Sequence, residues 1–150
     1  MEQKPTTELN HLLKTAGPEQ LDSYLSENKD YLADEEKAFY YYMKDVLDEK
    51  NRKLRDLYIA AGVTESYGGR ILRMEGHTKN RDMIIRLCLA GHFNLLETNR
   101  ALKLYGMSEL YAKEPRDACL IVAINNRIYD RYDVDELLLQ HGFPKLSPDE

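Results

Sequence analysis

The sequence has no run of about 18 apolar residues, the length that a membrane-spanning helix requires. Its first ten residues, MEQKPTTELN, lack the apolar segment of a secretory signal peptide, so we expect a cytoplasmic protein. Cysteine is scarce as well: Cys88 and Cys119 are the only two, and both fall in apolar helical patterns. This usage is typical of buried thiols in a reducing compartment rather than of a disulfide framework.

Motifs for catalysis and for cofactor binding are also missing. The four histidines share no metal-ligand spacing with one another or with either cysteine, which argues against zinc. Gly68-Gly69 is not followed by Lys-Ser or Lys-Thr, so it is not a phosphate-binding loop, and no serine lies in a nucleophile elbow. We therefore predict no enzyme and no cofactor. A small helical enzyme whose site leaves no motif is the remaining alternative.

Acidic side chains dominate the whole chain but not its middle. The 150 residues are 43% hydrophobic and 31% charged, which suits one domain or a small domain with a helical extension, and the net charge is −5. Residues 50–86 nevertheless hold nine Lys and Arg against four Asp and Glu. A basic segment on an acidic body can dock on a phosphate backbone if its cations share one face. The alternative is that these cations are ordinary solvated side chains on helix exteriors.

Apolar residues recur at helical spacing along most of the chain, which predicts an all-α fold. Two short helices, ending at Gly17 and near Glu27, predict an N-terminal hairpin within residues 1–34; the second should bury Leu21, Tyr24 and Leu25. A longer helix follows, capped by Asp34 and reaching about Glu49. The apolar run of residues 118–124 is compatible with a strand by composition, but the Arg-Asp pair that precedes it favours a helix.

The central stretch predicts a helix, a tight turn and a second helix. Residues 53–61 place apolar side chains at i, i+3, i+4 and i+7, which form one stripe against a core. Gly62 suits the left-handed end of that helix, and Thr64 suits the N-cap of the next. In the second helix, predicted over about residues 64–74, Ser66, Gly69, Arg70 and Arg73 can project to one side. The other side is then apolar, with these residues: Tyr67, Ile71, Leu72 and Met74.

A helical hairpin is repeated in the last part of the chain. Arg81-Asp82 opens one apolar helix, and a second helix closes at Gly106; Arg116-Asp117 opens another, and its second helix closes at Gly142. Two copies are visible, whereas a solenoid needs three or more to bury its faces. We therefore predict that residues 107–150 form a C-terminal hairpin packed on a helix-turn-helix bundle of residues 35–106. Its apolar surplus would contact the bundle, a second copy or a protein partner.

The central residues resemble the lambda-repressor-like helix-turn-helix family, also called Xre regulators. The likeness rests on Leu57-Tyr58, on the turn Gly62-Val63-Thr64, and on the second helix and its exit, with Arg70-Ile71 and Arg73-Met74-Glu75. It covers about residues 39–104. The resemblance implies a transcriptional regulator whose second helix enters the major groove of double-stranded DNA, and a homodimer that binds two half-sites. It places Ser66, Gly69, Arg70 and Arg73 near bases. The residues placed near phosphates are Arg52, Lys53, Thr64, Lys79 and Arg81.

Two features depart from the family pattern. The supporting helix begins with Arg52 and Lys53 rather than with a polar residue such as Gln, which changes how it could hold a phosphate. Gly68 and Gly69 each cost roughly 1 kcal/mol of helix propensity relative to Ala. Two explanations are open: close approach of a partner to the backbone, or a bent or short helix. A helical protein-interaction module that keeps the bundle without binding DNA is therefore the alternative function.

Overall fold

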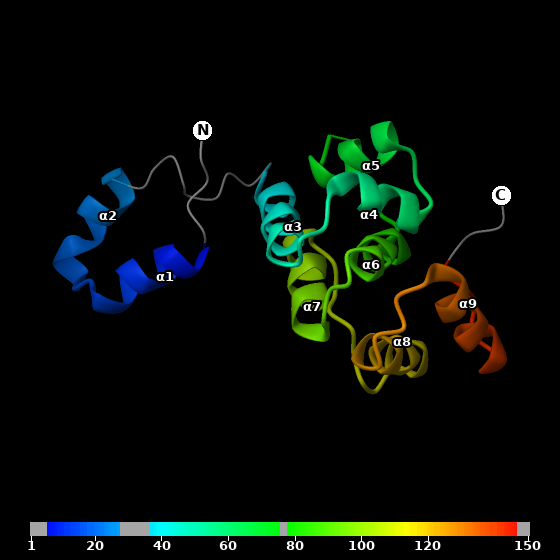
Figure 1. The fold of residues 1–150 in the computed structure, drawn as a ribbon. Coiled ribbons are helices and arrows are strands. Elements are labelled where there is room, and N and C mark those ends of the chain that lie inside the picture. The colour runs from blue at the N-terminus through cyan, green and yellow to red at the C-terminus, as the bar shows by residue number, and fades with distance from the viewer. Residues whose placement is uncertain (1–5, 28–36, 76–77, 147–150) are drawn as a thin grey trace. The chain divides into compact units, whose positions relative to one another are not determined.

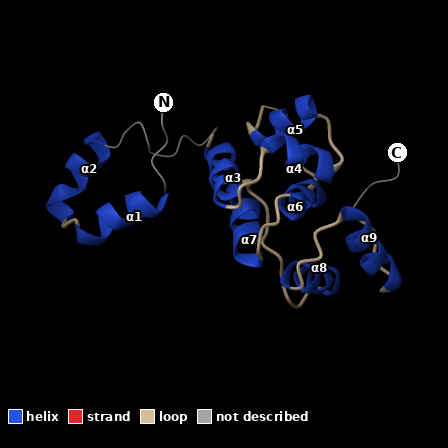
Figure 2. Ribbon diagram, in the orientation of Figure 1, coloured by secondary structure: helices blue, strands red, loops and turns tan. Residues whose placement is uncertain are grey.

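The computed structural model describes residues 6–27, 37–75 and 78–146. These residues form α-helices and one short 3-10 helix and contain no strand (Figure 2), so the all-α prediction is confirmed for them. The chain divides into two compact units, residues 1–35 and 36–150. No helix in the described ranges has both the length and the apolar character needed to cross a membrane.

The described residues of the first unit form two short α-helices joined by a tight turn. They comprise α1 (Thr6–Thr15), the 3-10 helix η1 (Pro18–Gln20) and α2 (Leu21–Glu27). The amide of Gly17 donates to Oε1 of Gln20 at 2.7 Å and closes the turn. The predicted burial in α2 was wrong: Leu21 is 48% exposed and Leu25 is 42% exposed. Two helices this short have too little apolar surface to enclose a core. The predicted cap Asp34 lies outside the described residues.

The second unit contains seven helices among its described residues, and α6 lies in the middle of them (Figure 1). α6 packs against α4, α7 and α9, while α3 packs against α7 and α5. Every residue of α6 from Met83 to Ala90 is buried, and all of them except Arg86 are apolar. The bounds are α3 (Ala38–Glu49), α4 (Leu54–Ala61), α5 (Glu65–Leu72), α6 (Arg81–Ala90), α7 (Leu95–Leu104), α8 (Pro115–Asn125) and α9 (Arg131–Gln140).

Aromatic side chains join α3 to α7. The rings of Phe39 and Tyr105 meet edge to face with their centroids 4.7 Å apart, and both residues are almost fully buried. The hydroxyl of Tyr42 donates to the carbonyl oxygen of Glu97 at 3.0 Å. α3 and α7 are thus fixed to each other, and α5 packs on α3 while α6 packs on α7.

Candidate nucleic-acid interface

The predicted helix, turn and helix are present at α4 and α5. Gly62 has φ of 73°, the left-handed conformation that ends α4. Thr64 is the N-cap of α5, and its hydroxyl accepts a hydrogen bond from the amide of Tyr67 at 3.1 Å. The local signals in the sequence therefore fix the connection between the two helices.

Gly68 brings α5 close to α4. A Cβ atom at this position would lie 2.5 Å from Cδ1 of Tyr58, a distance that real Cβ atoms do not reach. Tyr58 is buried, with 6% of its surface exposed, so its ring has little room to move. The glycine thus permits a close approach within the chain itself, and α5 remains a regular helix of eight residues. Gly68 therefore serves a close approach to the backbone, but the approach is made by α4 of the same chain and not by a partner.

The outward side of α5 carries the side chains that were predicted to meet bases. Ser66, Arg70 and Arg73 are exposed, whereas Gly69 is buried. The guanidinium of Arg73 extends over Gly69, and a Cβ built there would lie 2.9 Å from Nη1 of Arg73. One prediction for this helix was wrong. Tyr67 is 45% exposed, because it falls on the outward side and not among the packed residues Ile71 and Leu72.

Arg73 and Arg70 differ in their surroundings. Nε of Arg73 lies 3.1 Å from Oε1 of Glu75, and this hydrogen bond raises the pKa of the guanidinium above its ordinary value. Both partners are half exposed, so the pair competes directly with water. Arg70 makes no hydrogen bond or ion pair with any described residue, and its side chain points away from the packed face. Arg70 is therefore the cation of α5 most open to a ligand.

The residues predicted to contact phosphates differ in exposure and in whether they bond within the chain. Lys53 and Lys79 are exposed, and Thr64 is exposed at the N-terminal end of α5. Arg52 is half-buried, and its Nη2 donates to the carbonyl oxygen of Ala90 at 3.0 Å. Arg52 therefore satisfies a carbonyl at the C-terminal end of α6, where unpaired backbone oxygens attract cations.

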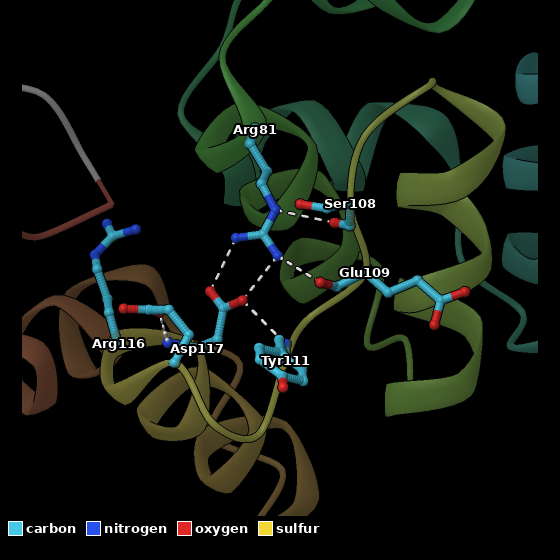
Figure 3. Close-up of a pocket in the computed structure, with 7 residues that line it drawn as sticks. Arg81, Ser108, Glu109, Tyr111, Arg116 and Asp117 are labelled. Carbon is cyan, nitrogen blue, oxygen red and sulfur yellow. Dashed lines mark hydrogen bonds and ion pairs between the residues drawn. The ribbon is translucent and has the colours of Figure 1, made fainter.

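Arg81 requires a correction, because its guanidinium is occupied inside the chain. Nη1 and Nη2 donate to the two carboxylate oxygens of Asp117 at 2.8 and 2.9 Å. Nε donates to the carbonyl oxygen of Ser108 at 3.0 Å, and Nη2 also donates to that of Glu109 at 2.9 Å. Four of its five N–H groups are thus engaged (Figure 3), and we assign Arg81 to the fold and not to phosphate binding.

Arg116 repeats this arrangement in the opposite direction. Its Nη1 and Nη2 donate to the two carboxylate oxygens of Asp82, both at 2.9 Å. Its Nε donates to the carbonyl oxygen of Pro144 at 3.0 Å. The Arg-Asp pair at the start of α6 therefore binds the Arg-Asp pair at the start of α8, each arginine meeting the other pair's aspartate.

The ion pairs change the pKa values of Asp117 and Arg116. Burial of Asp117 favours its neutral form, but the hydrogen bonds from Arg81 and from the amide of Tyr111, together with the charges of Arg81 and Arg116, outweigh burial and lower its pKa. The hydrogen bond to Asp82 raises the pKa of Arg116. The carboxylate of Asp117 and the guanidinium of Arg116 are therefore held in their charged forms.

Two further hydrogen bonds repeat at equivalent positions within each half, and the helix packing is reciprocal between the halves. The amide of Leu110 donates to Oδ1 of Asn99 at 2.8 Å, and the amide of Leu146 donates to Oδ1 of Asp135 at 2.8 Å. α6 packs on α9, and α7 packs on α8. Reciprocal contacts between equivalent positions are the signature of a two-fold interface. The hairpin α6–α7 and the hairpin α8–α9 are thus joined as two similar halves.

A third copy of the hairpin is present at α4–α5, where the sequence predicted two copies. In each copy a residue with positive φ follows the first helix within two positions: Gly62 at 73°, His92 at 61° and Arg127 at 57°. The next residue is apolar, and its amide bonds a carbonyl five residues earlier: Val63 to Tyr58, Phe93 to Cys88 and Ile128 to Ala123. A side-chain cap then opens the second helix, at these residues: Thr64, Asn94 and Asp130.

The repeated connection was missed because its sequence is not conserved between copies. Glycine occupies the left-handed position in the first copy only, and the other two place His92 and Arg127 there. A search for an apolar residue followed by a Thr, Asn or Asp cap is the signal that could have found it. Since the same left-handed turn also ends other helices, for example at Gly106 and Gly142, it does not by itself single out α4–α5 as the functional hairpin.

A cleft lies beside the Arg-Asp pairs, lined by Arg81, Ser108, Glu109, Tyr111, Glu114, Arg116 and Asp117 (Figure 3). Its charged groups bond mainly to one another: Asp117 accepts from Arg81, and its own amide donates to Oε2 of Glu114 at 2.6 Å. The cleft therefore has a structural role. Over the described ranges, no group of three or more His, Cys, Asp or Glu residues is arranged to hold a metal ion.

Comparison of the chain with protein-family models, curated proteins and solved structures found no match. The functional assignment therefore depends on the geometry and charge of the described residues alone.

Proposed function

We propose that this protein is a sequence-specific DNA-binding transcriptional regulator that places α5 in the major groove. The observation that carries the proposal is the division of α5 into two faces. One face is locked against Tyr58 through Gly68, and the other presents Ser66, Arg70 and Arg73 to solvent. A helix held firmly on one side and polar on the other is what major-groove recognition requires.

Arg70 is the residue that we assign to base recognition. An arginine that is exposed and without internal partners can donate two hydrogen bonds to O6 and N7 of a guanine, the commonest specific contact in the major groove. Ser66 lies one turn earlier on the same outward side and can donate to, or accept from, a neighbouring base. Together, Ser66 and Arg70 would contact base edges in the major groove from the first two turns of α5.

We assign Arg73 to the periphery of the contact between α5 and DNA. Its pairing with Glu75 holds it over Gly69 in the free protein, and a phosphate or a base offers the guanidinium an alternative acceptor. Lys53, Thr64 and Lys79 are exposed and are assigned to phosphates. Of the cations in residues 50–86, Lys53, Arg70 and Lys79 would then meet the DNA, whereas Arg52, Arg81 and Arg86 are held by contacts within the fold.

The alternative function is a helical protein-interaction module, and one observation favours it. On α7 Leu96 is 80% exposed and Leu104 is 38% exposed, and both line a groove with Arg100 and Lys103. Two exposed leucines that flank a groove on one helix offer an apolar surface that a partner helix could cover. In this case the same hairpin motif would serve DNA binding in one family and protein binding in this chain.

The test is binding of the purified protein to a pool of fluorescent duplex DNA across a salt series. With two to four phosphate contacts, the logarithm of the association constant should fall with the logarithm of salt concentration at a slope of about −2 to −4. Arg70→Ala/Arg73→Ala should weaken binding at least tenfold, while circular dichroism and melting temperature stay unchanged because both side chains are exposed.

Arg100→Ala/Lys103→Ala is the matched control, since it removes two cations from α7 and leaves α5 intact. Its affinity should remain within about threefold of the unaltered protein if the loss depends on position and not on net charge. Equal losses in the two double variants would indicate non-specific attraction only. No binding at low salt would reject the proposal and leave the protein-interaction module.

A further inference from the structure

The second helices of the three hairpins carry different side chains at equivalent outward positions. Counted from the N-cap, which is Thr64, Asn94 or Asp130, the second, sixth and ninth residues are exposed in every copy. These residues are Ser66, Arg70 and Arg73 in α5, Leu96, Arg100 and Lys103 in α7, and Tyr132, Glu136 and Leu139 in α9. Among the three helices, α7 therefore combines an outward leucine with two cations.

α7 also borders a groove, and the segment that follows the helix forms its opposite wall. Six residues line this groove, which we call the α7 groove: Leu96, Asn99, Arg100, Lys103, Leu104 and Glu109. The amide of Leu110 donates to Oδ1 of Asn99 at 2.8 Å, and Arg81 donates to the carbonyl oxygen of Glu109 at 2.9 Å. These bonds hold the wall in place before any ligand arrives, so binding would cost little ordering.

The two leucines of the α7 groove face solvent. Leu96 is 80% exposed, and Leu104 is 38% exposed. They are eight residues apart, which corresponds to about 12 Å along a helix. A partner helix can present apolar side chains two turns apart, at about the same spacing, and could cover both leucines at once.

The charge of the α7 groove favours an acidic ligand. Arg100 and Lys103 are exposed, and neither side chain forms an ion pair with a described residue. The guanidinium of Arg100 lies 5.6 Å from the ring centroid of Tyr42, a contact that leaves its N–H groups open to an acceptor. Glu109 is the one carboxylate among the six lining residues, so the two cations leave the groove with a net charge of +1. Carboxylates on a partner would complement this charge.

We propose that the α7 groove binds an acidic amphipathic helix of a partner protein. The apolar side of that helix would cover Leu96 and Leu104, and its Asp or Glu side chains would pair with Arg100 and Lys103. The proposal names the class of partner that suits α7, and it holds whether or not α5 binds DNA.

A second copy of the chain suits the α7 groove less well. In a two-fold contact through α7, Arg100 and Lys103 of one copy would meet the same cations of the other. DNA also suits it less well. Phosphates could pair with the two cations, but they would leave Leu96 without an apolar partner.

The test is selection of peptides that bind the immobilised full chain from a phage-displayed library of random sequences. Each peptide is about 16 residues long, enough for about four turns of helix. We expect the enriched peptides to carry more Asp and Glu than Lys and Arg, and to repeat apolar residues at helical spacing. One enriched peptide, synthesised with a fluorescent label, then gives a dissociation constant by anisotropy.

Two variants of the α7 groove should weaken binding of this labelled peptide. Leu96→Ala removes apolar surface that the peptide would bury, and Arg100→Ala/Lys103→Ala removes the two cations. Each should raise the dissociation constant about fivefold or more. All three side chains are exposed, so the melting temperature should stay unchanged.

The matched control for the charge variant is Arg70→Ala/Arg73→Ala, because it removes two cations from the equivalent outward positions of α5. The control for the leucine is Leu139→Ala, since Leu139 is 58% exposed on α9. Both controls should leave the dissociation constant of the peptide within about twofold.

Enriched peptides that are neutral or basic would overturn the proposal, and so would a library that yields no peptide dependent on Leu96. Equal losses in the two double variants would also overturn it, because binding would then follow net charge. The same two double variants serve the DNA experiment with their roles exchanged. Peptide binding can therefore fail while DNA binding holds, and DNA binding can fail while the peptide binds.

Discussion

The first hairpin, α4–α5, and the two later hairpins share one connection but differ in how they are held and in what they expose. α4 and α6 are joined by arginines that donate to the last carbonyl oxygen of a helix. Arg86 donates to Ala61 at the end of α4, and Arg52 donates to Ala90 at the end of α6. α6 and α8 are joined through reciprocal Arg-Asp pairs at their starts. The same supersecondary unit is thus linked by two different kinds of polar contact.

The second helices of the hairpins also differ in the side chains that they expose. The second helix of the first hairpin presents Ser66 and Arg70, whereas α7 presents Leu96. The shared turn orients each second helix, and the outward side chains then decide what the helix can bind. This comparison explains why the helix-turn-helix pattern alone is a weak functional signal and why the proposal depends on the cations of α5.

The largest expected effect concerns the junction of the later hairpins. Arg81→Ala removes the partner of Asp117, which is only 4% exposed, and leaves a charged carboxylate without its main compensation. We expect a loss of about 3 kcal/mol in the free energy of unfolding, within the range for breaking a buried pair. Urea denaturation followed by circular dichroism measures it.

Arg100→Ala is the control for this prediction, since Arg100 is exposed and lies 5.6 Å from the ring centroid of Tyr42. It should cost less than about 1 kcal/mol. A loss of similar size in Arg81→Ala and Arg100→Ala would mean that the reciprocal pairs do not hold the hairpins together. The exchanged variant Arg81→Asp/Asp117→Arg should recover part of the loss.

Smaller changes in stability are expected in the first hairpin, where alanine at two neighbouring glycines should act in opposite directions. Gly68→Ala should destabilise the protein by about 1 to 2 kcal/mol, because the new Cβ meets the buried ring of Tyr58 at 2.5 Å. Gly69→Ala should stabilise it by about 0.5 to 1 kcal/mol, because the new Cβ meets only the movable end of Arg73 and the helix gains propensity. Thermal denaturation of both variants checks the pair.

If both substitutions stabilise the protein, the ring of Tyr58 moves to make room for the new Cβ. Gly68 would then not set the distance between α4 and α5. Gly69→Ala also sharpens the assignment of base contacts. An unchanged affinity for duplex DNA would show that the backbone of Gly69 does not approach a base, leaving Ser66, Arg70 and Arg73 as the candidates.

The smallest effect is a pH dependence at the later junction. The pKa of Asp117 is lowered in the folded protein from its ordinary value of 3.8, so its ionised form stabilises the fold at pH above about 4. This contribution is lost as the pH falls through the lowered pKa, because the carboxylate is then protonated. The difference in unfolding free energy between the unaltered protein and Asp117→Asn should shrink from pH 6 to pH 3. A difference that stays constant would show that the charge of Asp117 is not what stabilises the junction.

Local features of the fold could be predicted from the sequence, because they depend on residues close together in the chain. The left-handed Gly62, the Thr64 cap and the buried run of α6 are of this kind. The helix predicted over about residues 64–74 ends at Leu72, two residues early, which is an ordinary error at a helix end.

The features that were missed depend on residues far apart. Arg81 was assigned to phosphate because its charge is visible in the sequence, whereas its partner Asp117 is 36 residues away. The exposure of Leu21 and Leu25 could not be predicted either, since periodicity indicates an apolar side of a helix without indicating whether another helix covers it.

The most direct measurement is a nuclear magnetic resonance titration of the amide-labelled protein with a duplex selected from the DNA pool. The account predicts that the largest chemical-shift changes occur from Ser66 to Arg73, with smaller changes at Lys53 and Lys79, and that α7 is unaffected. Changes centred on Leu96 and Leu104 of α7, or spread evenly over the surface, would contradict α5 as the helix that reads DNA.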